Sequence, residues 1–153
     1  MKPLNASRRE FCAHALTFVT VGSLLESCGG SPTSPSSGSS AALPVINTTV
    51  ANGVITLNIE PSSPLATVGN AALVQTPSGS FLVARVTQES FNALTAVCTH
   101  EACTVAGFQS GVYQCPCHGS QYSTSGAVTR GPATRPLRQY STQFANNVLT
   151  FSV

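Results

Sequence analysis

The sequence predicts an all-β fold for residues 43–153, arranged as an antiparallel sandwich or a partly open barrel. Three observations support this prediction. Val, Thr, Ser, Gly and Asn are plentiful, and they favour strands and turns over long helices. Apolar residues alternate with polar ones in short runs, as in a strand with one buried face. No stretch of residues 43–153 shows the 3.6-residue apolar period of an amphipathic helix.

The first predicted hairpin lies at "VANGV", residues 50–54. Asn52-Gly53 is a strong signal for a type I′ turn, because both central residues of that turn need a positive φ. The next run, "VITLNIE", places Ile55, Leu57 and Ile59 on one face with a period of two. A hairpin is therefore expected here, with a half-buried second strand.

Two more strands are predicted further along the chain. "FLVARV", residues 81–86, follows the turn sequence "TPSGS". "NVLTFSV", residues 147–153, has Leu149, Phe151 and Val153 in alternation. At 153 residues and 15.7 kDa, the chain is long enough for one domain and shows no internal repeat.

Charged residues are sparse, with seven Lys and Arg against five Asp and Glu. Residues 43–153 contain four Arg, three Glu and no Asp. Such a chain offers neither a basic stripe nor an acidic tail, so nucleic acid is not expected as a partner.

The first 27 residues are predicted to be a targeting signal. "SRREFC" puts Arg8 and Arg9 before an apolar run from Ala13 to Leu25. A helix of that length reaches about 20 Å, which is short of the roughly 30 Å hydrocarbon core of a membrane. The paired arginines followed by Phe11 resemble a twin-arginine export signal, and an ordinary secretory signal is the alternative.

The next segment resembles a lipoprotein processing site. In "LLESCGG", Leu25 and Ser27 precede Cys28, which would become a lipidated N-terminus; the alternative is an unmodified cysteine. Residues 28–42 are rich in Ser, Pro and Gly and are expected to form a flexible tether. Cys12 and His14 lie within the signal and are assigned no chemical role.

Cysteine and histidine are concentrated in two short segments, "CTHEAC" (98–103) and "CPCHGSQY" (115–122). A structural zinc finger pairs its thiolates in one segment and its imidazoles in another. Here each segment offers both kinds of donor, as Cys98-x-His100 and Cys115-x-x-His118. Such a set suits a two-iron cluster with two thiolates on one iron and two imidazoles on the other.

Three other interpretations of these residues stay open on the sequence alone. The four cysteines of residues 43–153 allow three disulfide pairings, so a metal-free disulfide scaffold would account for them. A zinc site is a second possibility, and a CxC redox motif at Cys115 and Cys117 is a third. None of the cysteine-only interpretations explains why His100 and His118 accompany the thiols.

The two segments resemble the cluster loops of Rieske iron–sulfur proteins of the cytochrome bc1/b6f, high-potential type. "GAVTRGPA", residues 126–133, resembles the glycine–proline loop that covers the cluster from a third side. The resemblance covers about forty residues, roughly 96–133, and implies an antiparallel Rieske-type β-sandwich whose cluster-binding subdomain is built from loops. It implies one [2Fe–2S] cluster, which binds Cys98 and Cys115 on the buried iron and His100 and His118 on the outer iron.

The same resemblance implies supporting roles for four further residues. Cys103 and Cys117 would form a disulfide between the loops. Ser120 would donate a hydrogen bond to a bridging sulfide, and Tyr122 would donate one to the sulfur of Cys98. Donors aimed at sulfur stabilise the reduced cluster, so we expect a potential near the upper end of the family's range.

The chain departs from the family at the tip of the first loop. Glu101 and Ala102 stand where the family usually has Leu-Gly, and Thr134 replaces the last proline of "GPAP". The family's Leu helps to form the apolar tip that docks at a quinol site, and a carboxylate is costly to bury unpaired. Glu101 favours a positively charged partner, unless it is an exposed residue without a role.

Together these features predict a one-electron carrier that is exported to the periplasmic side of a bacterial inner membrane. A lipid or the signal segment would attach it there, and its partner would be a c-type cytochrome or an oxidoreductase subunit. The alternative is the Rieske subunit of a quinol–cytochrome c oxidoreductase, which oxidises quinol through His100 and His118.

Overall fold

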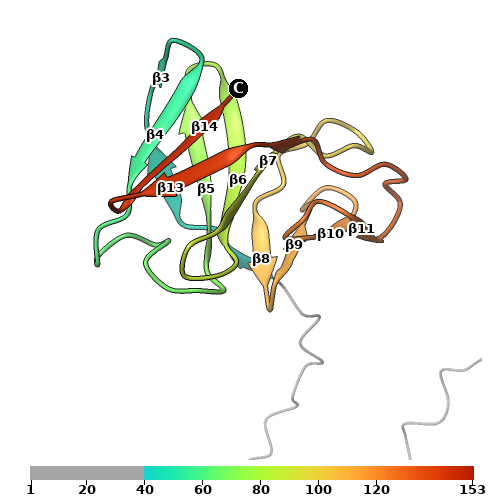
Figure 1. The fold of residues 1–153 in the computed structure, drawn as a ribbon. Helices are drawn as coiled ribbons and strands as arrows, with labels where there is room; N and C mark the ends of the chain where they lie inside the picture. Colours follow the sequence, from blue (N-terminus) through green and yellow to red (C-terminus); the bar gives the residue numbers. More distant parts are fainter. Residues whose placement is uncertain (1–39) are drawn as a thin grey trace, which may run out of the picture. The chain divides into compact units, whose positions relative to one another are not determined.

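The computed structural model describes residues 40–153, in which every regular element is a strand (Figure 1). The predicted all-β class is confirmed. The predicted signal segment, Cys28 and residues 28–39 of the predicted tether lie outside the described residues. Within residues 40–153, no helix is long and apolar enough to cross a membrane.

The strands form three sheets. The first contains β1 (Ala41–Ala42), β8 (Gly107–Gln109), β9 (Val112–Gln114), β10 (Gln121–Ser123) and β11 (Val128–Arg130). The second contains β12 (Gln139–Tyr140), β7 (Phe91–Thr95), β6 (Gly79–Arg85), β5 (Ala71–Thr76) and β2 (Val45–Asn47). The third contains β13 (Thr142–Ala145), β14 (Val148–Ser152), β4 (Val54–Asn58) and β3 (Val50–Ala51).

The second sheet is the middle layer, because β5, β6 and β7 bury side chains on both faces. On β6, Leu82 and Ala84 pack in one core, whereas Phe81 and Val83 pack in the other. A strand that is buried on both faces has a nearly continuous apolar sequence, as "FLVA" does here. One core contains the cluster-loop thiols, and the other is shared with β4 and β14.

The third sheet contains the predicted hairpin. Asn52 and Gly53 have positive φ angles of 53° and 75° between β3 and β4, so the type of turn expected there is confirmed. Ile55, Leu57 and Ile59 are all buried, as the alternation predicted. Val153 differs from Leu149 and Phe151, because it follows the end of β14 and stays exposed.

The structure differs from the predicted antiparallel arrangement at one strand pair. β2 pairs with β5 in parallel, whereas the other strand pairs of the described residues are antiparallel. Strand direction depends on where the connecting chain runs, and residues 48–70 leave this sheet to form β3 and β4 before returning. The first strand also begins at Ala41, two residues before the boundary that composition suggested.

The subdomain that bears the cysteines has a sheet of its own. β8, β9, β10 and β11 form a meander of three-residue strands, so the region is more regular than the predicted loop-built site. Strands of this length are too short to display a period of two in the sequence. In Figure 1 these strands lie beside the middle sheet, on the side opposite β3 and β4.

Candidate metal centre

Two loops that extend from strands of different sheets form the site. Residues 98–103 follow β7, and residues 115–120 join β9 to β10. In the first loop the N–H of Cys98 donates to the carbonyl of Cys103, and the N–H of Ala102 donates to the carbonyl of Cys98. The N–H groups of Cys115 and Gly119 close the second loop in the same way, on Ser120 and Cys115. Each loop is therefore a turn closed by its own backbone.

A disulfide joins the tips of the two loops. Cys103 and Cys117 are bonded at an S–S distance of 2.07 Å, which confirms the pairing implied by the resemblance. The other two pairings and a Cys115–Cys117 redox pair are therefore excluded. Cys98 and Cys115 remain as free thiols.

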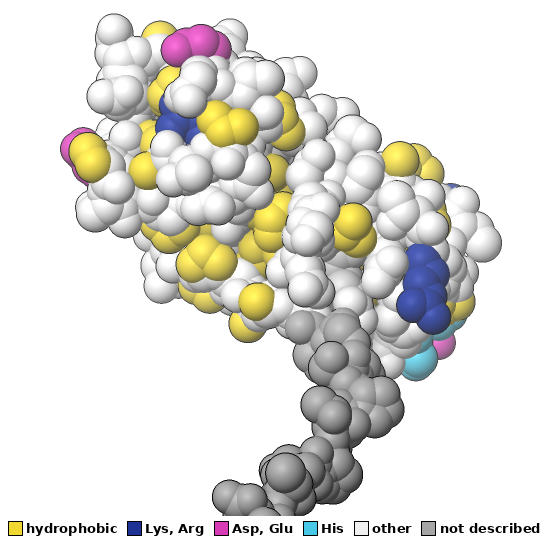
Figure 2. Space-filling model, turned by 90° about the horizontal axis from the view of Figure 1, so that it is seen from below, with side chains coloured by type: hydrophobic (Ala, Val, Ile, Leu, Met, Phe, Trp, Pro, Cys, Tyr) yellow, Lys and Arg dark blue, Asp and Glu magenta, His cyan; other side chains and the backbone are white. Residues whose placement is uncertain are grey.

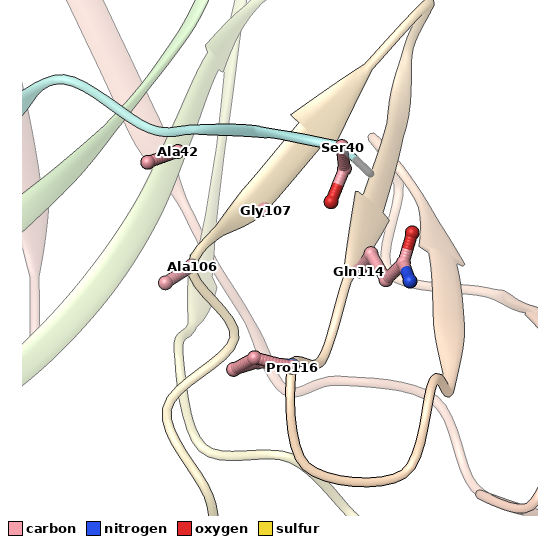
Figure 3. Close-up of a pocket in the computed structure, with 6 residues that line it drawn as sticks. All are labelled: Ser40, Ala42, Ala106, Gly107, Gln114 and Pro116. Carbon is pink, nitrogen blue, oxygen red and sulfur yellow. The ribbon is translucent and has the colours of Figure 1, made fainter. Parts of the chain in front are cut away.

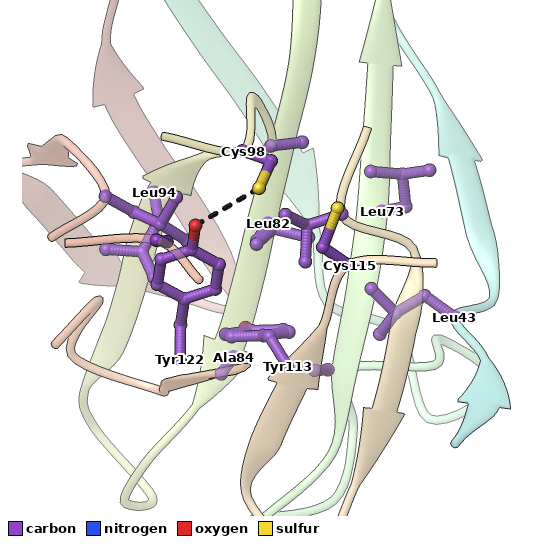
Figure 4. Close-up of a cluster of buried hydrophobic side chains, with 14 residues drawn as sticks. Leu43, Leu73, Leu82, Ala84, Leu94, Cys98, Tyr113, Cys115 and Tyr122 are labelled. Carbon is purple, nitrogen blue, oxygen red and sulfur yellow. Dashed lines mark hydrogen bonds between the residues drawn. The ribbon is translucent and has the colours of Figure 1, made fainter. Parts of the chain in front are cut away.

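The two free thiols lie in the core beneath the loops (Figure 4). Cys98 is 3% exposed and Cys115 is 1% exposed. Burial raises the pKa of Cys115, and the neighbouring Cys98 raises it further. Burial also acts to raise the pKa of Cys98, but hydrogen bonds from Tyr122 and the backbone of His100 outweigh it, so this pKa is lowered.

The two imidazoles lie on the outer side of the same loops. The ring centroids of His100 and His118 are 4.9 Å apart, with an interplanar angle of 83°. Both side chains are exposed. The Oε2 atom of Glu101 lies 3.7 Å from Nδ1 of His118, so a carboxylate stands beside the imidazoles. Buried sulfur and exposed nitrogen donors thus occupy opposite sides of one site.

The hydroxyl of Tyr122 connects the strand β10 to the first loop. It lies 3.2 Å from Sγ of Cys98, and the N–H of Thr99 donates to it at 3.2 Å. The Thr99 hydroxyl lies 3.1 Å away and donates its own proton to the carbonyl of Arg135. The Tyr122 hydroxyl therefore has two possible acceptors within reach, the sulfur of Cys98 and the Thr99 oxygen, and Figure 4 shows the contact to sulfur.

A third segment closes the site behind the second loop. Ser120 is fully buried, and its hydroxyl oxygen accepts a hydrogen bond from the N–H of Ala133 at 3.0 Å. This bond leaves the Ser120 proton free to donate elsewhere. The glycine–proline segment predicted over residues 126–133 is thus tied to the loop that carries Cys115 and His118.

Residues 59–141 match the Rieske [2Fe-2S] domain family. The chain belongs to that family. It is therefore a Rieske electron carrier that binds a [2Fe–2S] cluster, and the donors of the structure fit such a cluster chemically. Two free thiols and two imidazoles suit the mixed ligation of a Rieske centre. The disulfide removes Cys103 and Cys117 from the metal donors, although they lie close to Cys115.

Similar sequences come from cytochrome b6-f complexes, which confirms the resemblance to that type. The chain is 45% identical over 60 residues to the "cytochrome b6-f complex iron-sulfur subunit" of Synechococcus sp. (strain JA-2-3B'a(2-13)). It is 42% identical over 91 residues to the subunit of the same name from Prochlorococcus marinus (strain NATL1A). These alignments cover 39% and 52% of this chain, and only 35% and 48% of the relatives. The chain thus spans less than half the length of these relatives.

A solved structure supports the fold. A chain in the complex of reduced oxygenase and oxidized ferredoxin in carbazole 1,9a-dioxygenase superposes with a TM-score of 0.51 and 22% identity. The superposition covers 64% of this chain and 93% of that one. At this identity the likeness concerns the fold alone.

The sequence did not predict the contacts of two residues at the site. Thr99 links Tyr122 to Arg135, although the residue lies inside the "CTHEAC" segment. Arg135 itself belongs to a segment after the predicted subdomain boundary at residue 133. No local pattern signals either contact, because the partners are 23 and 36 residues apart.

Two hollows flank the loops. One is lined by uncharged residues where β1 pairs with β8, among them Ser40, Gly107 and Pro116 (Figure 3). The other runs along the first loop and includes Cys98, His100, Arg135 and Arg138. Only the second hollow brings charged side chains beside the predicted ligands.

Proposed function

We propose that this chain carries single electrons on the outer face of a bacterial inner membrane, with its cluster bound by Cys98, Cys115, His100 and His118. One observation carries the proposal. Two loops that a disulfide joins each contribute one buried free thiol and one exposed imidazole. When bound, the cluster supplies a centre that takes up and releases one electron at a time.

The side chains around the thiols would keep the inner side of the site dry and fix its hydrogen bonds. Cys98, Cys115, Tyr113 and Tyr122 belong to one core of buried side chains (Figure 4). The Tyr122 hydroxyl lies 3.2 Å from the sulfur of Cys98 and would donate its proton to it, and Ser120 has a proton free to donate. Both donors would favour added negative charge at the sulfurs, which raises a reduction potential.

The exposed imidazoles mark the side on which electrons would be exchanged. His100 and His118 lie at the surface, whereas the thiols are almost wholly buried. Figure 2 shows histidine side chains at one end of the face in view, with a glutamate and an arginine side chain beside them. A partner protein that contacts this end would reach the imidazoles without any change in the fold of the domain.

Metal analysis and electron paramagnetic resonance of the reduced full chain test the ligand assignment. We expect two irons, two sulfides and a Rieske-type spectrum. Cys115→Ser should lose the cluster. Ser141→Ala changes an exposed residue outside the two loops and should retain it. Zinc in place of iron, or retention of the cluster by Cys115→Ser, would refute the proposal.

Export and membrane attachment form a separate part of the proposal, which is supported by Arg8, Arg9 and Cys28 in the sequence. A stable disulfide also suits an oxidising compartment. Mass spectrometry of the mature protein should find a lipid-modified Cys28 at its N-terminus. Any other N-terminus would contradict the lipid anchor.

A second candidate function is the Rieske subunit of a quinol–cytochrome c oxidoreductase, with quinol bound at His100 and His118. The names of the cytochrome b6-f relatives favour it. Glu101 argues against it, because a carboxylate beside His118 would have to enter an apolar quinol site. Adding the protein to bc-type membranes that lack their own Rieske subunit should restore quinol-dependent cytochrome c reduction only if this candidate is correct.

A further inference from the structure

The groove beside the first loop combines a predicted cluster ligand with basic side chains. It has a volume of about 570 Å³, and its lining includes His100, Val97, Arg135, Pro136 and Arg138. Val97 is 48% exposed. A surface that combines exposed apolar residues with arginine is typical of a protein–protein contact.

A hydrogen bond and a ring contact hold one side of the groove in place. Thr99 donates a 2.6 Å hydrogen bond to the carbonyl of Arg135, so the segment with the arginines is tied to the loop with His100. The Arg138 guanidinium lies 4.7 Å from the centre of the Tyr140 ring and is oriented by that contact. The backbone of Arg135 and the guanidinium of Arg138 are therefore held beside the first loop.

Charge is distributed unevenly over the described residues. Arg130, Arg135 and Arg138 belong to the segment around the site, against Glu101 alone. Neither Arg135 nor Arg138 has a carboxylate within ion-pair distance among residues 40–153. Glu60 and Glu89 lie in the other part of the domain, in the connections that follow β4 and β6. The end of the domain that carries the imidazoles is thus the basic end.

We propose that this groove, defined by Val97, His100, Arg135, Pro136 and Arg138, is the docking site for an acidic surface of the electron-transfer partner. The inference rests on the proposed function and replaces the positively charged partner that Glu101 alone suggested. Two arginines outnumber the single carboxylate in the groove lining. Carboxylates of the partner that reach Arg135 and Arg138 would place its surface against His100. One electron would cross this contact, and no atom would be transferred.

Small redox ions of opposite charge provide the test. The reduced full chain is mixed with hexacyanoferrate(III), which takes one electron to become hexacyanoferrate(II), or with tris(1,10-phenanthroline)cobalt(III), which becomes the cobalt(II) complex. At low ionic strength, Arg135→Gln and Arg138→Gln should each slow the reaction with the anion about three-fold, and the double variant about ten-fold. The reaction with the cation should not slow, and the differences should shrink in high salt, which shortens the screening distance to about 3 Å at 1 M.

Arg130→Gln is the matched control, because it removes the same charge outside the groove. An octaglutamate peptide should compete with hexacyanoferrate(III) on the native chain and fail to do so on the double variant. If the double variant behaves like Arg130→Gln, the groove proposal is wrong. It is also wrong if the arginines promote binding to phosphatidylglycerol vesicles and not to the peptide, because the groove would then contact a membrane.

The visible and paramagnetic resonance spectra of each variant separate this failure from failure of the proposed function. A native chain without a [2Fe–2S] spectrum would refute the proposed function itself. If the spectrum is intact but the rates of electron transfer to hexacyanoferrate(III) do not change when Arg135 and Arg138 are replaced, only the docking site is refuted.

Discussion

At the scale of single residues, the hydroxyl of Tyr122 is expected to raise the midpoint potential of the cluster. This hydroxyl contacts Sγ of Cys98 at 3.2 Å. Because that hydrogen bond stabilises extra negative charge on sulfur, Tyr122→Phe should lower the midpoint potential by roughly tens of millivolts, where about 59 mV is a tenfold change in equilibrium for one electron. Ser120→Ala should act in the same direction. Protein-film voltammetry measures both.

Tyr113→Phe is the control for this prediction. The Tyr113 hydroxyl is buried in the same core but has no hydrogen-bond partner among the described residues. Its removal should therefore leave the potential unchanged. If Tyr113→Phe shifts the potential as much as Tyr122→Phe does, the effect comes from core packing and not from the hydrogen bond to sulfur.

Ala102 is a second residue with a measurable consequence. Its φ of 51° lies in the left-handed region, which costs a residue with a Cβ roughly 1–2 kcal/mol. The family usually has Gly at this position, so Ala102→Gly should raise the free energy of unfolding by about 1 kcal/mol. Urea unfolding at fixed cluster content measures the change.

Ala145→Gly provides the contrast for Ala102. Ala145 is exposed on β13 and does not have a positive φ, so glycine there should lower the stability by about 0.5–1 kcal/mol. Destabilisation by Ala102→Gly of the same size would show that the backbone at residue 102 is not strained.

At the scale of elements, the disulfide joins two loops that secondary structure alone does not connect. Cys103 and Cys117 are 14 residues apart, and cross-links around loops of about this size contribute roughly 3 kcal/mol. Cys103→Ser with Cys117→Ser should therefore lower the stability by a similar amount and speed the loss of the cluster's visible absorbance. A thiol reductant should have the same effect on the native chain. An unchanged rate of cluster loss would mean that the loops hold their positions without the cross-link.

At the scale of the whole molecule, two cores share one middle sheet, and only one of them contains the thiols. Leu82 is fully buried in the core with Cys98 and Cys115, and Leu149 is fully buried in the other. Each change to Ala should cost about 2–5 kcal/mol. Leu82→Ala should also shorten the lifetime of the bound cluster, as followed by visible absorbance. If Leu82→Ala and Leu149→Ala lower the stability equally and also leave equal cluster lifetimes, the core around the thiols has no special role in retaining the cluster.

The sequence by itself determined the all-β class, the first hairpin and the chemistry of the site. The alternation around Ile55 and the Asn52-Gly53 turn predicted a hairpin, because these signals depend only on neighbouring residues. The "CTHEAC" and "CPCHGSQY" segments predicted the cluster, because each contains both kinds of ligand within a few residues.

Tertiary structure decided how these parts come together. The parallel pairing of β2 with β5 depends on a connection of more than twenty residues, and no local pattern encodes it. Thr99 meets Arg135 across 36 residues, and this contact brings a basic segment beside His100. The charge around the site is a sum over residues that are distant in the chain and close in space. For this reason Glu101, considered alone, suggested a partner of opposite charge to the proposed acidic one.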